Sequence, residues 1–217
     1  MENVNSSLAD LRQNYTLAGL SEADLNSDPI AQFNLWFQQA LDSDVLEPNA
    51  MTLATATSDG KPTARIVLLK GVDERGFVFY TNYESQKGVQ LMANPYAALV
   101  FLWDKLERQV RIEGKVVKLE RQESESYFHS RPKASQLGAW ASAQSRVIAN
   151  REVLEANLNG LEQKYQNKTV PIPPHWGGFR VIPQRIEFWQ GRPNRLHDRL
   201  VYDLQQDHSW KIQRLAP

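Results

Sequence analysis

The sequence contains no cysteine among its 217 residues. Disulfides, thiolate metal ligands and a cysteine nucleophile are therefore excluded. The longest apolar stretches, such as YAALVFLW at 96–103, are too short to cross a membrane. The first fifteen residues are polar and lack the apolar core of a signal peptide. These absences favour a cytoplasmic protein that does not bind a membrane.

The chain also has no excess of either charge, because 25 Lys and Arg residues balance 25 Asp and Glu residues. A barrel that binds nucleic acid would need a basic stripe, and none is evident, so we disfavour this class of protein. Any phosphate recognition must instead come from a local group of basic residues.

The common catalytic motifs are missing as well. The sequence has no GxGxxG after a strand, no GxxxxGK[ST], no GxSxG and no HExxH. The four histidines are scattered along the chain, so we expect no metal site. An enzyme without a metal or an activated nucleophile needs an organic cofactor for its difficult step.

The hydrophobic pattern predicts an α+β or mainly β fold. Residues 27–41 predict a helix that Asp28 caps and Pro29 begins. Its apolar face consists of Ile30, Phe33, Trp36, Phe37 and Leu41. The period then changes to two, and residues 51–81 predict three strands joined by tight turns, which implies antiparallel neighbours. Further strands are predicted at 96–103, 108–120, 179–190, 199–204 and 209–215. Helices are predicted at 85–95 and 150–166, and helical or looped segments at 123–132 and 135–145. In the helix at 150–166 the apolar residues of one stripe are Leu154, Leu158, Leu161 and Tyr165. We therefore expect an antiparallel barrel of six or more strands with helices packed outside.

Three groups of basic residues are candidates for phosphate binding. In RIVLLK, regular strand alternation would put Arg65 and Lys70 on opposite faces, although both can also be sheet-edge charges. In NYESQKG, Lys87 lies at a helix start that attracts anions, or it is a solvated lysine after an ordinary cap. The segment YFHSRPKASQ combines hydroxyl groups with Arg131, which suits a phosphate monoester, or it is a polar loop between helices.

The stretch GRPNRLHDRL at 191–200 raises the same question. Arg195 and His197 are two residues apart after a turn, so both can point to one side. Asp198 then points the other way, where it can orient a neighbouring arginine. Arg192 receives no role, and we interpret it as a solvated loop charge.

Ten strings together give the chain a specific resemblance: RIVLLK, FYTN, ERQVRIEG, YFHSRP, SQLGAW, QS, PHWGGFRV, IEFWQG, RLHDR and the terminal LAP. In this order, from about Leu11 to Pro217, they resemble the pyridoxamine/pyridoxine 5′-phosphate oxidase family. The resemblance implies a split β-barrel that binds FMN and works as a homodimer with FMN at the interface. It also implies oxidation of pyridoxine or pyridoxamine 5′-phosphate to pyridoxal 5′-phosphate, within vitamin B6 biosynthesis and salvage. Oxygen is the acceptor and hydrogen peroxide a product, and the amine substrate also releases ammonia.

The resemblance assigns roles residue by residue. The implied reaction is hydride transfer from substrate C4′ to flavin N5. Family positions that contact FMN correspond to Arg65, Ile66, Val67, Leu68, Leu69, Lys70, Tyr80, Thr81, Gln86, Lys87, Gln109, Gln144, Ser145, Trp189 and Arg199. Positions that bind substrate correspond to Arg12, Tyr15, Lys70, Tyr127, Arg131, Ser135, Arg195, Leu196 and His197, of which Arg195 and His197 are the catalytic candidates. For His197 the role of a base and that of a hydrogen-bonding lid both remain open.

Two further expectations follow from the resemblance. Residues 1–26 form an N-terminal segment that is flexible or folds over the active site, and residues 27–217 form a single FMN-binding domain. The family commonly has a basic residue just before Lys87, and here the residue is Gln86. This departure predicts weaker FMN binding than an arginine would give.

Two other interpretations stay open. One is a different split-barrel flavin enzyme, such as a flavin reductase or a deazaflavin-dependent reductase. The other is a carrier protein that binds FMN or pyridoxal phosphate without catalysis. Peroxide production in air distinguishes an oxidase from a carrier.

Overall fold

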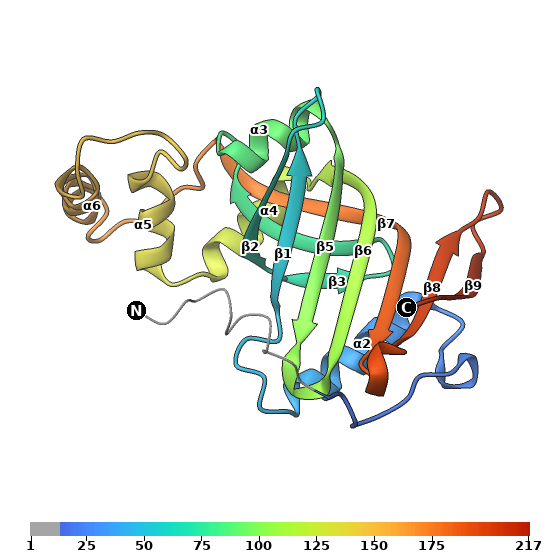
Figure 1. The fold of residues 1–217 in the computed structure, drawn as a ribbon. Coiled ribbons are helices and arrows are strands. Elements are labelled where there is room, and N and C mark those ends of the chain that lie inside the picture. Colours follow the sequence, from blue (N-terminus) through green and yellow to red (C-terminus); the bar gives the residue numbers. More distant parts are fainter. Residues whose placement is uncertain (1–13) are drawn as a thin grey trace, which may run out of the picture. The chain divides into compact units, whose positions relative to one another are not determined.

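The computed structural model describes residues 14–217. Within this range the strands are β1 (Ala50–Ala56), β2 (Pro62–Leu68), β3 (Gly71–Asp73), β4 (Gly76–Asn82), β5 (Tyr96–Trp103), β6 (Arg108–Lys118), β7 (Trp176–Gln190), β8 (Asp198–Leu204) and β9 (Trp210–Leu215). The α-helices are α2 (Pro29–Leu41), α3 (Gln86–Ala93), α4 (Arg121–Ser130), α5 (Lys133–Ala141) and α6 (Glu152–Lys164). Figure 1 traces these elements along the chain. The predicted mainly β or α+β class is confirmed.

Two helices begin where short polar side chains cap them. Asp28 accepts a hydrogen bond from the backbone N–H of Ile30 at 2.9 Å, and Pro29 occupies the first turn of α2. Ser85 accepts from the backbone N–H of Gly88 at 3.3 Å and caps α3. Both caps satisfy N–H groups that a helix start leaves without intrahelical partners. The predicted start of α2 is therefore confirmed.

The strands form one sheet in the order β2-β1-β5-β6-β7-β4-β3, with β8 paired to β7 and β9 paired to β8. The β1–β2 hairpin aligns Thr55 with Thr63 and Leu53 with Arg65. The prediction of three strands within 51–81 is wrong, because this region holds four. The fourth is the short β3, which forms a tight hairpin with β4 in which Gly71 faces Val78.

The chain divides into two compact units. One comprises residues up to 48, 100–111 and 185–217, and the other comprises 49–99 and 112–184. Strands β5, β6 and β7 contribute residues to both units. A single domain over residues 27–217 therefore stays a prediction, and each unit is described by itself below.

The first unit is built on aromatic side chains. Phe33 of α2 packs edge-on against Phe101 at 5.2 Å, and Trp36 of the same helix packs against Phe188 at 5.1 Å between ring centroids. All four rings are buried. The α2 face predicted from helical spacing is thus buried at Ile30, Phe33 and Trp36, whereas Leu41 at its end is exposed.

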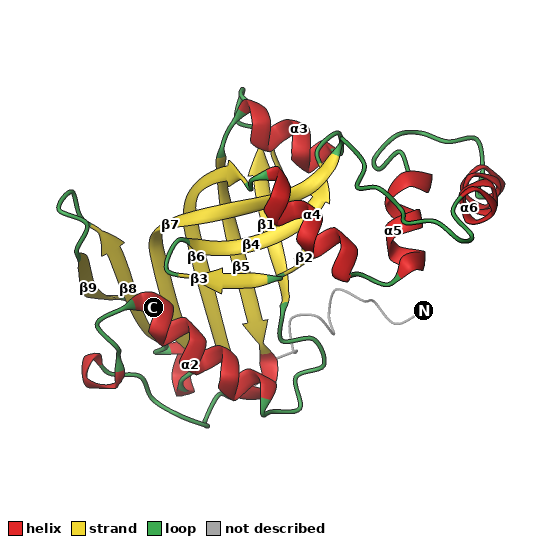
Figure 2. Ribbon diagram, turned by 180° about the vertical axis from the view of Figure 1, so that it is seen from behind, coloured by secondary structure: helices red, strands yellow, loops and turns green. Residues whose placement is uncertain are grey.

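The second unit has a core of its own beside its strands. Phe128, Leu137, Val170, Ile172 and Trp176 form a buried cluster. Half-buried residues of α6 and its C-cap pack against this cluster, as the predicted stripe requires: Leu158, Leu161 and Tyr165. In Figure 2, α4 lies along the strands of this unit, and α5 and α6 follow beyond its end. The arrangement places α4 and α5 where their side chains form one wall of a pocket.

Candidate active site

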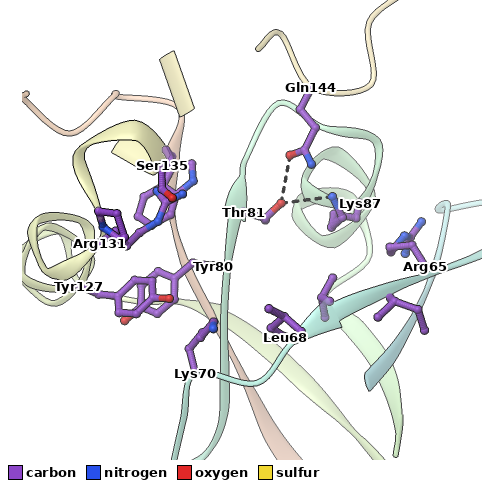
Figure 3. A pocket seen from close by; sticks show the side chains of 14 residues that line it. Arg65, Leu68, Lys70, Tyr80, Thr81, Lys87, Tyr127, Arg131, Ser135 and Gln144 are labelled. Atoms are coloured by element: carbon purple, nitrogen blue, oxygen red, sulfur yellow. Dashed lines mark hydrogen bonds between the residues drawn. The ribbon is translucent and has the colours of Figure 1, made fainter. Parts of the chain in front are cut away.

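A pocket of about 640 Å³ lies in the second unit. It is lined by residues of β2, β4, β7, α3, α4, α5 and the segments beside them: Arg65, Ile66, Val67, Leu68, Lys70, Tyr80, Thr81, Lys87, Tyr127, Arg131, Pro132, Ser135, Gln144 and Trp176. Figure 3 shows Arg65 and Lys87 on one side of Thr81, and Tyr127, Arg131 and Ser135 on the other. The pocket therefore has two cationic ends with strand β4 between them.

Lys87 forms part of the first end. Lys87 is only 8% exposed, and its ammonium group donates to Thr81 Oγ1 at 3.3 Å and to Ser85 Oγ at 3.4 Å. Burial, together with the nearby charge of Arg65, lowers the pKa of Lys87. A buried lysine with only hydroxyl partners is costly unless an anion completes its site.

Arg65 is the second cation at this end. Its guanidinium donates to the carbonyl of Leu53 at 3.2 Å, to Thr55 Oγ1 at 2.6 Å and to Thr63 Oγ1 at 2.5 Å. These partners are neutral, and within residues 14–217 no carboxylate pairs with Arg65 or Lys87. The positive charge at this end is therefore left for a ligand, and the adjacent start of helix α3 favours an anion.

An aromatic stack forms the second end. The ring of Tyr80 lies 3.9 Å from that of Tyr127 and 5.5 Å from that of Trp176, with interplanar angles of 15° and 11°. Burial raises the pKa of Tyr80 to about 12 and also raises the pKa of Tyr127. Both phenols therefore keep their protons near neutral pH and can donate hydrogen bonds.

Arg131 lies against this stack. Its Cζ atom is 4.7 Å from the ring centroid of Trp176, and burial lowers the pKa of the guanidinium. Its Nη1 atom is buried and has no hydrogen-bond partner among the described residues. Lys70 and Ser135 line the same pocket and bring a second cation and a hydroxyl group. An unpartnered buried donor beside a cation and hydroxyls is suited to an acidic ligand group.

Two interpretations of these residues need correction. Arg65 and Lys70 do not lie on opposite sides of a regular strand, because β2 ends at Leu68 and both residues line the same pocket. From its place in the string PHWGGFRV, we interpret Trp176 as a core or interface residue and assign it no function. It is 6% exposed and belongs to the core, but it also lines the pocket. The string PHWGG contains this residue, but it does not indicate that the indole ring contacts the guanidinium of Arg131.

The remaining predicted residues of this unit differ in whether they line the pocket. Gln144 accepts from Thr81 Oγ1 at 3.3 Å and lines the pocket. Leu69 is buried and its backbone N–H donates to the carbonyl of Asn49 at 2.8 Å. Gln86 is exposed in the first turn of α3, and Ser145 is exposed with a φ of 70°. Leu69, Gln86 and Ser145 are not among the residues that line the pocket.

The first unit holds a separate group of predicted site residues. The imidazole of His197 lies 4.6 Å from the ring of Trp189 and 5.8 Å from that of Tyr15. The backbone N–H of Arg192 donates to His197 Nδ1 at 3.1 Å. The ring nitrogen Nδ1 is therefore an acceptor, and the proton of the neutral ring is on Nε2. Arg195 and Leu196 are exposed in the same loop, and Gln109 is half-buried in β6. Arg12 lies outside the described residues.

Arg199 is held by a carboxylate. Its guanidinium donates to both oxygens of Glu187, at 2.8 and 3.0 Å, and this pairing raises the pKa of Arg199. Glu187 is 4% exposed. The bidentate geometry fixes the orientation of the guanidinium, and it also neutralises part of its charge.

The interpretation of Arg192 as a solvated charge is wrong. Its Nε atom lies 3.4 Å from Asp198, which also accepts from Arg214 Nη1 at 2.7 Å and from the backbone N–H of Leu20 at 3.0 Å. Asp198 therefore orients arginines, as predicted, and it also connects the loop at 192–198 to the N-terminal segment and to β9. The spacing of the sequence predicted that Asp198 would orient an arginine, but it could not identify which arginines.

Within residues 14–217, no group of three His, Asp or Glu side chains lies together as a metal site would require. In the same range no helix combines the length and apolar character that a membrane span needs.

Comparison with known proteins identifies the family. The family model described as "Pyridoxamine 5'-phosphate oxidase" matches residues 37–165, and that described as "Pyridoxine 5'-phosphate oxidase C-terminal dimerisation region" matches residues 176–217. A protein of Gloeothece citriformis named "Pyridoxine/pyridoxamine 5'-phosphate oxidase" is 65% identical over 214 residues, which cover 99% of this chain and 100% of that protein. A protein of Synechocystis sp. with the same name is 62% identical over 211 residues and covers 97% of this chain and 98% of its own length.

Solved structures agree with this assignment. The crystal structure of PhzG from Burkholderia lata, in complex with tetrahydrophenazine-1-carboxylic acid, has a TM-score of 0.88 and 32% identity, and covers 94% of this chain and 100% of its own. An FMN binding protein related to pyridoxamine 5′-phosphate oxidase, from Nostoc punctiforme, has a TM-score of 0.71 at 15% identity over 89% of this chain and 100% of its own, which shows the fold alone. The predicted antiparallel split barrel is confirmed, and the chain belongs to the pyridoxine/pyridoxamine 5′-phosphate oxidase family.

Proposed function

We propose that this protein uses FMN and oxygen to oxidise pyridoxine 5′-phosphate and pyridoxamine 5′-phosphate to pyridoxal 5′-phosphate. Pyridoxine 5′-phosphate and O₂ give pyridoxal 5′-phosphate and H₂O₂. Pyridoxamine 5′-phosphate consumes one water in addition and releases ammonia. Family membership supports the oxidoreductase class and FMN as the cofactor. A role in vitamin B6 biosynthesis and salvage, in the cytoplasm, is part of the same proposal.

The observation that carries the proposal is the pair of cationic ends within one pocket. Arg65 and Lys87 lie at one end, and Lys70 and Arg131 lie at the other. Among the described residues, none of the four is paired with a carboxylate. Two phosphate esters, one on the cofactor and one on the substrate, would each occupy one end and so account for this arrangement. A reductase that accepts an unphosphorylated substrate would need only one such end.

The first end fits the phosphate of FMN. A dianionic phosphate would accept from Arg65 and Lys87 and lie near the start of α3. The apolar side chains of Ile66, Val67 and Leu68 line the same pocket and suit a flat heteroaromatic ring. When bound, FMN supplies a two-electron acceptor that oxygen can reoxidise.

The second end fits the phosphate of the substrate. Lys70 and Arg131 supply positive charge, whereas Tyr127 and Ser135 supply directed hydrogen bonds. Because burial raises the pKa of Tyr127, its phenol stays protonated and donates. Binding the phosphate firmly orients the reacting carbon of the substrate and restricts its motion before oxidation.

We assign Arg195 and His197 to the same active site within a homodimer that holds FMN at its interface. The match of residues 176–217 to a dimerisation region supports the homodimer. In this assignment Arg195 orients the substrate and stabilises charge as the carbon is oxidised. The tautomer of His197 supports a lid that donates from Nε2 rather than a base at Nδ1, because Nδ1 already accepts from Arg192. The ring of Tyr15 contacts Trp189 and His197, which supports an N-terminal segment that covers the substrate.

The test is an anaerobic absorption spectrum of the purified protein reconstituted with FMN, recorded before and after addition of pyridoxamine 5′-phosphate. We expect the flavin band to bleach and to return when air is admitted, with formation of peroxide. A protein that retained flavin but showed no change with either phosphorylated substrate would be a carrier or an enzyme for another substrate. A protein that bound no FMN would overturn the cofactor assignment itself.

A further inference from the structure

Gln90 is a buried polar residue that no role assigned so far explains. It lies one turn after Lys87 in α3 and is only 5% exposed. Its side-chain oxygen Oε1 accepts hydrogen bonds from Thr55 Oγ1 at 2.6 Å and from Thr63 Oγ1 at 2.7 Å. These threonines face each other across the β1–β2 hairpin, so Gln90 joins the helix to both strands.

The same two hydroxyl groups also accept from Arg65. Its Nη1 atom donates to Thr55 at 2.6 Å, and its Nη2 atom donates to Thr63 at 2.5 Å. A guanidinium can only donate, so each threonine oxygen is an acceptor toward Arg65 and must direct its own proton elsewhere. The two threonine Oγ1 atoms also lie 3.3 Å from each other, but each lies closer to Gln90 Oε1, so the shorter bonds send both hydroxyl protons to Gln90. The four bonds therefore have one consistent direction, from Arg65 through Thr55 and Thr63 to Gln90.

This arrangement fixes which N–H groups of Arg65 remain for a ligand. Both hydrogens of Nη1 are used, by Leu53 and Thr55, and one hydrogen of Nη2 is used by Thr63. The N–H of Nε and the second N–H of Nη2 have no acceptor among the described residues. These two N–H groups form the edge of the guanidinium that binds two phosphate oxygens in parallel.

The chemistry of Gln90 explains why the charge of Arg65 is preserved. A carboxylate in this position would accept the same two protons, but it would also offset the positive charge beside it. The amide oxygen accepts both protons and is neutral. The site thus keeps an oriented cation that remains electrostatically available to an anion.

We propose that Gln90 is a positioning residue for cofactor binding, which holds the Arg65 guanidinium through Thr55 and Thr63 so that its free edge faces the FMN phosphate. This inference rests on the proposed binding of FMN at the first end of the pocket. It assigns to Gln90 a part of the selectivity for FMN over riboflavin, which has the same ring system but no phosphate.

The experiment compares FMN with riboflavin. The full-length protein, freed of flavin, is titrated with each compound, and dissociation constants are taken from flavin fluorescence. Gln90→Met removes the acceptor and retains much of the side-chain volume. We expect about a tenfold rise in the dissociation constant of FMN, since the bonds to a charged group lose their support, and no change for riboflavin. Gln163→Met, on the exposed face of α6, is the matched control and leaves both constants unchanged.

A double-mutant cycle tests whether Gln90 acts through Arg65. In an Arg65→Met background, Gln90→Met is expected to cause no further loss of FMN affinity. Thr63→Val supplies a second, smaller perturbation of the same chain of bonds, and it too is expected to weaken FMN alone. Thermal unfolding shows whether Gln90→Met is folded. If it is not, the FMN and riboflavin affinities of Thr63→Val test the inference instead.

The outcomes separate this inference from the proposed function. Equal losses for FMN and riboflavin, or additive losses in the Arg65→Met background, would show that Gln90 only packs the helix and would overturn the inference. Unchanged affinities in Gln90→Met and Thr63→Val, with FMN bound tightly by the wild type, would overturn it while the proposed function stands. A wild type that binds neither flavin would overturn both.

Discussion

The guanidinium of Arg131 lies over the indole ring of Trp176, with 4.7 Å between Cζ and the ring centroid. The two residues come from the end of α4 and the start of β7. The buried indole thus supports a cation whose Nη1 atom has no protein partner among the described residues. This contact orients Arg131 without neutralising its charge, because the aromatic ring has no net charge.

Trp176→Leu is therefore expected to weaken substrate binding. A cation–π contact of this kind contributes roughly 0.5–2 kcal/mol, so the KM for pyridoxamine 5′-phosphate should rise by about twofold to thirtyfold. FMN affinity should change little, since Trp176 lies at the second end of the pocket. Steady-state kinetics and FMN titration check both statements. Trp140→Leu is the control, because Trp140 does not line this pocket. An unchanged KM in Trp176→Leu would show that the ring only fills the core.

Lys87 predicts a pH dependence of FMN binding. Burial lowers its pKa in the flavin-free protein, so its positive charge is lost at a lower pH than that of an exposed lysine. A bound phosphate dianion favours the protonated form, and binding above the lowered pKa must therefore take up a proton. FMN affinity is expected to fall as the pH rises through that pKa. FMN dissociation constants measured across the alkaline range check this direction.

Two variants isolate the contribution of Lys87. Lys87→Met should weaken FMN binding by about tenfold to a hundredfold, as expected for loss of a hydrogen bond from a charged group worth about 1.5–3 kcal/mol, and should remove the alkaline fall. Lys87→Arg should shift the fall to higher pH. An alkaline fall that persisted in Lys87→Met would assign the titration to another group.

We expect a substitution of Gln86 to increase the affinity for FMN. The residue is exposed in the first turn of α3, beside the end of the pocket that we assign to the FMN phosphate. Gln86→Arg adds a cation there and should tighten FMN binding by a few-fold. The same charge opposes the helix macrodipole, so the flavin-free variant should lose roughly 0.3–1 kcal/mol of stability. Titration with FMN and chemical unfolding of the flavin-free protein measure the two effects. Equal FMN dissociation constants for variant and wild type would exclude Gln86 from the phosphate site.

Arg195 predicts a loss of turnover without loss of cofactor. Its side chain is exposed, and Arg195 is not among the residues that line the pocket of the second unit. Arg195→Leu should reduce kcat at least tenfold, the size expected when a charge interaction worth about 1.5–3 kcal/mol is lost, while the FMN dissociation constant stays within error. Arg192→Leu, in the same loop, tests whether a change in the conformation of the loop alone reduces kcat. Normal turnover in Arg195→Leu would exclude the assigned role.

The sequence predicted elements well where a regular period or a cap defined them. The stripe of Leu154, Leu158, Leu161 and Tyr165 predicted α6, and all but Leu154 are among the residues that pack against the buried cluster. Asp28 predicted the start of α2. The pairing of Thr55 and Thr63 with Gln90 was not predictable, because three neutral residues from separate segments show no common pattern. Their meeting depends on the register of the β1–β2 hairpin and on the packing of α3.

The same distinction applies to the candidate site. Basic residues and hydroxyl groups could be proposed from the resemblance, whereas the contacts that hold them could not. The partners of Arg192 and the ring beneath Arg131 come from residues far away in sequence. The error in placing Lys70 arose because periodicity was extended past Leu68, where the strand ends.

The lack of carboxylates around four cations has a consequence for the lifetime of the protein. Without FMN, like charges at Arg65 and Lys87 repel each other, and residues 14–217 supply no carboxylate as a counterion for either. A ligand that binds only the folded state raises its stability in proportion to the logarithm of ligand concentration. The supply of flavin in the cell would then determine how much of the newly made chain survives. Under the proposed function, a shortage of one vitamin cofactor would reduce the capacity to make another.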